Sequence, residues 1–190
     1  SANVVYASGL TVTGDKVNAV TPSGVKIEFP RAALARLDYT KGKLAYLSDW
    51  DKKKWTKLAT STEDRIDHPR FDKNLDDGPI RLDNVTYPKG LSIHSRTELT
   101  FELDGEYREF KAIIGVDDLV NGSEGPTLVQ IEDAATGKAL HKTLEISRKT
   151  KPMDVTVNVQ NVKSLRIKVT SPELLDLGRH VDLAEARVTK

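Results

Sequence analysis

An alternation of apolar and polar residues with a period of two is the feature that most constrains how this chain can fold. In the stretch GLSIHSRTELTFEL, residues 90–103, apolar side chains fall on every second position near both ends. This period is typical of a β-strand that buries one of its faces. The pattern returns at short intervals, in residues 108–118, 127–133, 139–147, 153–160, 164–171 and 181–190.

Turn-forming residues separate these segments, and little of the sequence has the spacing of a helix. Many short strands at close spacing favour an all-β fold, an antiparallel β-sandwich or jelly roll. The aromatic residues Tyr107 and Phe110 lie within strand patterns and are predicted to be buried. The predicted core consists of Ile93, Leu99, Phe101, Phe110, Ile113, Val129, Val157, Leu165 and Val169.

The first part of the chain has short strands of its own. Turns at TGDK and TPSG punctuate residues 1–50, which predicts a small SH3-like or Sm-like β meander. Residues 51–77 are polar and turn-rich, and they are predicted to be a linker or a long ordered loop before a sandwich over residues 78–190. Trp50 and Trp55 lie at this boundary. They are either platforms for a sugar or, as we favour, contacts through which the meander packs on the sandwich.

Composition excludes several classes of function. The 190 residues include 29 Lys and Arg against 28 Asp and Glu, and the charges are interspersed, whereas nucleic-acid binders usually carry a basic patch. The absence of cysteine excludes disulfides and thiolate metal sites. No apolar run approaches the ~20 residues of a membrane-spanning helix, so no membrane insertion is expected.

Catalytic motifs are also missing from the sequence. It contains no Gly-x-Ser-x-Gly elbow, no phosphate-binding glycine loop and no His-Glu-x-x-His zinc motif. Carboxylates are numerous, but a glycosidase pair normally lies in a deep cleft, and two small β modules leave little room for one. The sequence therefore predicts that the chain is not an enzyme.

Three motifs, in this order, carry a family resemblance: Gly-Leu-x-x-His at Gly90–His94, Tyr-x-x-Phe-x-x-x-x-Gly-x-Asp at Tyr107–Asp117, and His-x-Asp-x-Ala-acid-Ala-Arg at His180–Arg187. Over about residues 55–190 the chain resembles the NPCBM family of carbohydrate-binding modules. The resemblance implies a galactose-binding-like β-sandwich that binds glycans, with galactose-type sugars as the expected ligand. It also implies a larger bacterial parent protein with further domains that is secreted, periplasmic or associated with the cell envelope.

One residue departs from the family pattern. Leu183 stands where the family usually has an aromatic residue, typically Trp. Sugar modules commonly stack a pyranose on such a ring, so its loss would remove a platform if the ring is exposed. If the position belongs to the core, Leu is a tolerable replacement. The alternative function is therefore a structural or protein-interaction sandwich that has lost sugar binding.

His94 has the opposite parity to the core residues of its strand, which allows two interpretations. It either bonds a neighbouring loop and fixes how the strand enters the sandwich, or belongs to a sugar site. Asp117 and Asp118 follow an apolar run at the end of one strand, and His180 and Asp182 open the last strand. Because antiparallel neighbours start and end on the same side of a sheet, these groups are predicted to converge at one tip. There an imidazole and carboxylates would bond sugar hydroxyls.

A calcium ion is the one cofactor that the resemblance suggests. The acidic loop carries Asp72, Asn74 and Asp76 in the alternation of an EF-hand, but its glycine, Gly78, comes one place late and no helix flanks it. A solvated acidic turn is the simpler interpretation of that loop. Galactose-binding-like sandwiches often hold a structural calcium ion, and Glu185 on the last strand is the ligand predicted for it.

Overall fold

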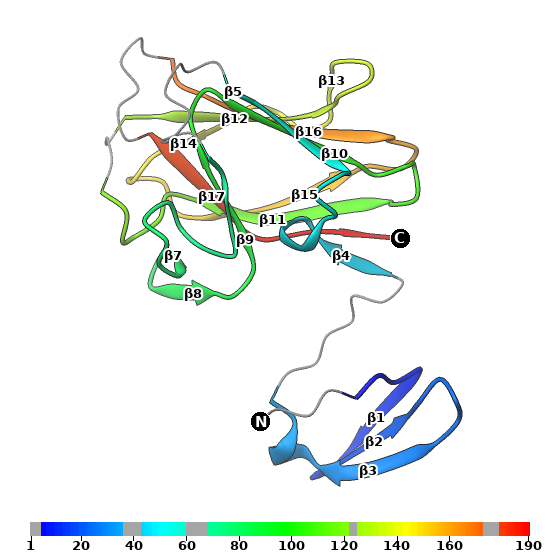
Figure 1. Ribbon diagram of the computed structural model, residues 1–190. Helices are drawn as coiled ribbons and strands as arrows, with labels where there is room; N and C mark the ends of the chain where they lie inside the picture. The colour runs from blue at the N-terminus through cyan, green and yellow to red at the C-terminus, as the bar shows by residue number, and fades with distance from the viewer. Residues whose placement is uncertain (1–4, 36–42, 60–67, 122–124, 173–178) are drawn as a thin grey trace. The chain divides into compact units, whose positions relative to one another are not determined.

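The chain forms two compact units, Ser1–Tyr39 and Thr40–Lys190, in the computed structural model. The structure describes residues 5–35, 43–59, 68–121, 125–172 and 179–190 (Figure 1). Its described elements are strands and two short 3-10 turns, so the predicted all-β class is confirmed. Among these elements no helix is long and apolar enough to cross a membrane.

The first unit contains a three-stranded antiparallel sheet in the order β1-β2-β3. The strands are β1 (Gly9–Thr13), β2 (Lys16–Val20) and β3 (Lys26–Pro30), followed by a 3-10 turn at Arg31–Ala33. The central strand β2 buries Val17 and Ala19. This sheet is the described part of the predicted meander, and closure into an SH3-like or Sm-like barrel stays a prediction.

The second unit has two six-stranded antiparallel sheets. Figure 1 labels most of their strands. The first sheet has the order β13-β12-β16-β10-β5, with β14 also paired to β12. Its strands are β5 (Trp55–Ala59), β10 (Thr97–Glu102), β12 (Thr127–Asp133), β13 (Lys138–Ala139), β14 (Leu144–Ile146) and β16 (Ser164–Thr170).

The second sheet has the order β15-β11-β17-β9-β6, with β4 also paired to β17. Its strands are β4 (Leu44–Tyr46), β6 (Arg70–Phe71), β9 (Gly90–His94), β11 (Glu109–Gly115), β15 (Met153–Asn158) and β17 (His180–Thr189). A 3-10 turn at Leu47–Asp49 follows β4, and a separate hairpin pairs β7 (Ile80–Leu82) with β8 (Val85–Tyr87). The predicted antiparallel sandwich is confirmed.

The core lies between the two sheets and contains all the predicted core residues except Ile113. On β11 the inward positions are Phe110, Ala112 and Ile114, so Ile113 has the opposite parity. It packs on the outer face of this sheet, against the small cluster formed by Ile80, Leu82 and Ala184. The prediction for Ile113 was wrong because it chose both Phe110 and Ile113, which an alternating strand places on opposite faces.

The sandwich begins earlier in the chain than the predicted boundary at residue 78. Strand β4 pairs with β17, and the segment predicted as a linker contributes the edge strands β5 and β6. The indole of Trp55 lies 5.0 Å from the ring of Phe71 and 6.3 Å from that of Phe101, centroid to centroid. These edge strands are short and lie within a polar, turn-rich stretch, which is why their sequence reads as a loop.

Strand β17 connects the two ends of the sandwich. Residues 180–184 pair with β9, and residues 187–189 pair with β4 along the same edge. Between them Glu185 has a φ of 54°, and the register with β11 shifts at this point, as in a β-bulge. The amide of Glu185 donates to the carbonyl of Lys89, so the bulge is bonded to the segment that precedes β9.

Candidate functional site

The three sequence motifs meet at one end of the sandwich, which we call the tip: His94, the start of β17, and the segment that follows β11. In the β9–β17 register, His94 is opposite His180 and Ser92 is opposite Asp182. In the β11–β17 register, Gly115 is opposite Asp182. The backbone therefore brings the predicted residues together, although His94 lies at the end of β9 and not near the beginning of its strand, as the pattern over residues 90–103 had indicated.

Gly90, the first residue of the first motif, allows β9 to lie close to β17. A Cβ atom at this position would lie 2.7 Å from the carbonyl oxygen of Leu183, 2.9 Å from Cδ1 of Ile80 and 3.0 Å from Cα of Ala184. Backbone atoms cannot give way as a flexible side chain can. The glycine is therefore required by packing beneath the tip.

Asp117 is fully buried and accepts hydrogen bonds from four N–H groups. Its Oδ1 accepts from the amides of Leu119 at 2.8 Å and Val120 at 3.1 Å and from Nδ2 of Asn74 at 3.2 Å, and its Oδ2 accepts from the amide of Arg81 at 2.8 Å. A buried carboxylate with this many donors fixes the surrounding backbone. Asp117 thus joins the segment after β11 to the loop before β9.

Asp118 holds the β7–β8 hairpin from the exposed side. Its carboxylate accepts from the amides of Asp83 at 3.2 Å and Asn84 at 2.8 Å, and its Oδ2 lies 3.7 Å from Nε of Arg81. Its side chain keeps 31% of its surface exposed. Of the predicted carboxylates at the tip, Asp118 is therefore the one that meets solvent.

Asp182 lies fully buried beneath the tip and differs in its chemistry from Asp118. Its Oδ1 accepts from the hydroxyl of Ser92 at 2.5 Å, which ties β17 to β9. Burial, and then the hydrogen bond and charge of neighbouring Asp117, raise the pKa of Asp182 well above its ordinary value of 3.8. A raised pKa favours the neutral carboxyl, which avoids a second buried negative charge beside Asp117.

The two histidines of the tip differ in exposure. His180 is buried, whereas His94 is half-buried, with Nδ1 3.3 Å from the carbonyl oxygen of Ser95. The amide of Ser95 donates to the carbonyl of Arg179 at 2.9 Å, which closes the end of the β9–β17 pair. Residues 173–178, which lead into Arg179, lie outside the described part of the chain.

The tip therefore has two layers. Asp117, His180 and Asp182 form a buried layer, and His94 and Asp118 lie at its surface. A ligand in solvent can reach the surface layer directly, while the buried layer holds that surface in place. The direct participation of all five residues in sugar binding stays a prediction.

Glu185 has neighbours that suit a structural role better than a calcium site. Its Oε2 accepts from the hydroxyl of Tyr46 at 3.0 Å and lies 3.5 Å from Nη1 of Arg187. Calcium prefers several oxygen ligands, and an adjacent guanidinium opposes a second cation. No group of three or more His, Cys, Asp or Glu side chains within the described ranges is arranged to hold a metal ion. The residues around Glu185 do not fit the predicted calcium ion.

The acidic loop around Asn74 is organised by its own side chains. Oδ1 of Asn74 accepts from the amides of Asp76 at 3.1 Å and Gly78 at 2.8 Å, as in an Asx turn. Asp72 accepts from Nζ of Lys89 at 2.7 Å and from the amide of Gly90 at 3.1 Å. The loop is thus an ordered support for the beginning of β9.

Leu183 is fully buried and belongs to the core of the sandwich. It pairs with Leu91 on β9 and with Ile114 on β11. In this chain position 183 is therefore a core position, and an aromatic residue there would not be a solvent-exposed platform. The departure from the family pattern changes core packing rather than the surface of the tip.

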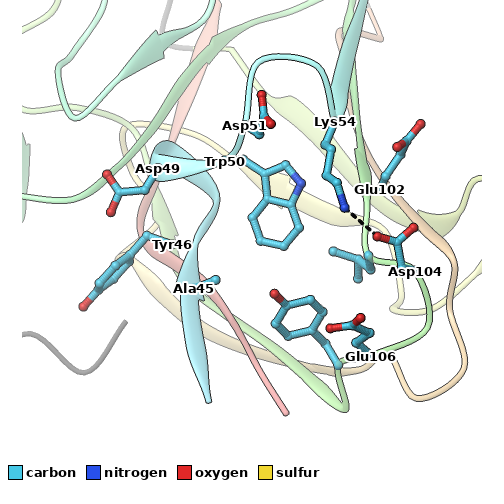
Figure 2. Close-up of a pocket in the computed structure, with 11 residues that line it drawn as sticks. Ala45, Tyr46, Asp49, Trp50, Asp51, Lys54, Glu102, Asp104 and Glu106 are labelled. Carbon is cyan, nitrogen blue, oxygen red and sulfur yellow. Dashed lines mark hydrogen bonds and ion pairs between the residues drawn. The ribbon is translucent and has the colours of Figure 1, made fainter. Parts of the chain in front are cut away.

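A cavity of about 340 Å³ lies at the other end of the sandwich and was not predicted (Figure 2). Trp50 and Tyr107 line it, with ring centroids 5.6 Å apart. Trp50 also contacts Phe101 of the core at 6.4 Å. Tyr107 is half-buried rather than fully buried, in contrast to Phe110. The contact of the meander with either tryptophan stays a prediction.

The sequence carried one signal for this cavity. Trp50 is followed by the polar run DKKK, and Tyr107 is preceded by the polar run DGE. An aromatic residue within a polar turn, outside the alternation of the strands, has only one side available for core packing. That signal distinguishes Tyr107 from Phe110 but does not reveal that the two turns lie together.

Comparison with known proteins identifies the family. Residues 43–189, which fall within the second unit, match the family model described as the NPCBM/NEW2 domain. A protein of Renibacterium salmoninarum that carries the name of an endo-alpha-N-acetylgalactosaminidase is 27% identical over 94 residues, which are 50% of this chain and 6% of that protein.

Solved structures share the fold. The CBM51 of Clostridium perfringens GH95, in complex with methyl-galactose, has a TM-score of 0.64 and 21% identity over 77% of this chain and 99% of that module. The CBM51-2 and INT domains of Clostridium perfringens ZmpB, in complex with GlcNAc, have a TM-score of 0.63 and 20% identity over 96% of this chain and 40% of that one. With its described sandwich and the match over residues 43–189, the chain belongs to the NPCBM/NEW2 domain family.

Proposed function

We propose that this chain is a non-catalytic carbohydrate-binding module that holds galactose-type glycans at its tip. The observation that supports the proposal is the strand register, in which His94 is opposite His180 and Asp182 is opposite both Ser92 and Gly115. Membership of the NPCBM/NEW2 family supports it, as does the shared fold of a CBM51 module whose structure contains methyl-galactose.

The surface layer of the tip supplies the polar contacts. The half-buried imidazole of His94 exchanges hydrogen bonds with a sugar hydroxyl, because a neutral ring carries one donor and one acceptor nitrogen. The carboxylate of Asp118 accepts from a second hydroxyl. These contacts are few and exposed to water, so the affinity falls between millimolar and micromolar, about −4 to −8 kcal/mol.

The buried layer supplies preorganisation rather than contact. Asp117 fixes the segment that bears Asp118, and the Ser92–Asp182 bond holds the end of β9 against β17. A site whose groups are already in place loses less entropy when its ligand binds. Asp117, His180 and Asp182 thus contribute to sugar binding through the position of His94 and Asp118.

The parent protein in this proposal is a larger bacterial protein that is exported or associated with the envelope. The chain spans a small part of its curated relative and less than half of the ZmpB structure. A module of this kind keeps a catalytic or envelope domain close to a glycan by raising its effective concentration there.

Replacement of His94 tests the proposal. His94→Ala should weaken the binding of methyl-galactoside by about tenfold or more, which corresponds to ~1.4 kcal/mol, because a direct hydrogen bond is lost. Binding is measured by NMR titration of the purified chain and extended on a glycan array. The melting temperature should change little, since His94 is already partly exposed.

His141→Ala is the matched control, because His141 contacts a backbone carbonyl in the same way, Nδ1 to Lys142 O at 2.8 Å, between the edge strands β13 and β14 of the first sheet. It should bind sugar as the original chain does. A large loss of stability in His94→Ala with binding retained would assign His94 a structural role. Failure of the original chain to bind any glycan would favour the structural or protein-interaction function instead.

A further inference from the structure

We propose that the cavity between Trp50 and Tyr107 is a second binding subsite, which takes a neutral pyranose. The cavity lies at the end of β10 that carries Glu102, whereas the tip lies at the end that carries Thr97. The six residues of β10 span about 17 Å, so one sugar unit cannot occupy both places. The proposal shares its ligand class with the proposed function but uses none of the residues of the tip.

Two aromatic rings give the cavity the apolar surface that the tip lacks. The planes of Trp50 and Tyr107 are inclined at 51°, and the edge of Trp50 packs against Phe101 at 87°. The core therefore holds the indole in place while part of each ring remains uncovered, since both residues are half-buried. The C–H face of a pyranose packs on such rings. At the tip, by contrast, the exposed large apolar side chains nearest Asp118 in sequence and fold are aliphatic, Val85 and Leu119.

Donors and acceptors surround the rings on one side, as Figure 2 shows for Lys54, Glu102 and Asp104. Nζ of Lys54 donates to Oδ2 of Asp104 at 2.8 Å, and the carboxylate of Glu102 is exposed next to them. A sugar hydroxyl both donates and accepts, so an ammonium beside carboxylates suits a pair of neighbouring hydroxyls.

The indole N–H of Trp50 is a second and independent indication of a polar ligand. It is shielded from solvent and has no acceptor among the described residues. A buried donor without an acceptor is costly, and a native structure usually offers it a partner. Movement of the exposed Lys54 side chain would let a hydroxyl oxygen reach the indole N–H and become that acceptor.

The charges favour a neutral ligand over a cation. The cavity is lined by several carboxylates, but lysines neutralise three of them: Lys54 pairs with Asp104, Lys89 with Asp49 and Lys190 with Glu106. The ammonium of Lys54 also lies at the cavity itself, where it would repel a cationic ligand. An uncharged sugar meets both kinds of charge without this repulsion.

The test is an NMR titration of the intact chain with methyl-galactoside and, separately, with N-acetylglucosamine. Amide shifts are expected in residues 50–54 and 102–107. Glu102→Gln and Tyr107→Ala should weaken the response of these amides by about fivefold or more, as expected for a lost charge-assisted bond or ring contact. Glu145→Gln, an exposed acid on β14, is the matched control and should leave the response unchanged.

His94→Ala separates the two proposals, since it should leave the cavity response intact. Shifts at the tip alone, or cavity shifts unaffected by Glu102→Gln and Tyr107→Ala, would overturn the second subsite while the proposed function stands. Shifts in the cavity alone would overturn the tip and support the subsite. If neither sugar shifts the amides of the tip or of the cavity, both proposals are overturned. If the cavity binds tetramethylammonium and not sugar, the subsite proposal alone is overturned.

Discussion

The two ends of the sandwich treat polar side chains in opposite ways. At the tip, Asp117 and Asp182 are buried. Asp117 accepts hydrogen bonds from backbone amides such as that of Arg81, and Asp182 accepts one from the hydroxyl of Ser92. At the cavity, Glu102 and Asp104 are exposed to solvent, and the aromatic residues Trp50 and Tyr107 are only half-buried. A buried polar group must be satisfied within the protein, whereas an exposed one can be replaced at little cost. Stability should therefore depend on the acids of the tip and hardly on those of the cavity.

The largest effect should come from Asp117→Ala. This change leaves four N–H donors without their acceptor in a buried place. The free energy of unfolding should fall by about 3 kcal/mol or more, since each unsatisfied buried donor costs about 1–3 kcal/mol. Urea denaturation of the purified chain measures the loss.

Asp154→Ala provides the comparison, because Asp154 lies exposed on the edge strand β15 of the same sheet. It should shift the unfolding midpoint only slightly. If Asp117→Ala were equally mild, the buried layer of the tip would not be the support that its contacts indicate, and the contrast between the two ends would fail.

An intermediate effect, dependent on pH, is expected from Asp182→Asn. Burial and neighbouring Asp117 raise the folded-state pKa of Asp182 above its unfolded value. The stabilisation from its proton is complete below the unfolded pKa of about 3.9 and is lost as pH rises toward the raised folded value. Asparagine keeps an acceptor for Ser92 but cannot ionise.

The variant should thus match the original chain in stability below about pH 4 and exceed it at pH 7. Subtraction of the two urea curves at each pH removes the contributions of all other groups. Parallel curves across this range would show that Asp182 titrates alike in the folded and unfolded chain. Asp154→Asn, at an exposed position, should give such parallel curves.

The alternation of apolar and polar residues predicted the sandwich, because every second residue of a short segment faces the core. The tip was also predictable, since His94, Asp117 and His180 lie at strand ends and antiparallel pairing fixes which ends meet. The division of the tip into a buried and a surface layer could not be predicted. Burial of Asp117 depends on Asn74 and Arg81, which come from a loop whose sequence shows only polar character.

The cavity lay beyond prediction for a different reason. Trp50 and Tyr107 come from two turns separated by more than fifty positions in the chain, and no periodic pattern relates them. Strands β4 and β5 flank the first turn, and the sequence predicts a linker or a loop where β5 lies. Local patterns thus predict faces of strands well and the meeting of loops poorly.

The smallest effect on stability should come from Glu102→Gln, at the cavity end. Its amide donates to the carbonyl of Lys54 at 2.9 Å through the backbone, and the substitution leaves that bond unchanged. Its side chain is exposed, so the free energy of unfolding should change by no more than about 0.5 kcal/mol.

Glu98→Gln, on the same outer face of β10, is the reference, because Glu98 bonds Lys168 at 3.0 Å and lies 3.5 Å from Arg166. It should lose more stability than Glu102→Gln in the same urea assay. A larger loss for Glu102→Gln would mean that the acids of the cavity support the fold as those of the tip do. An effect of Glu102→Gln on sugar binding could then no longer be assigned to the binding site rather than to the fold.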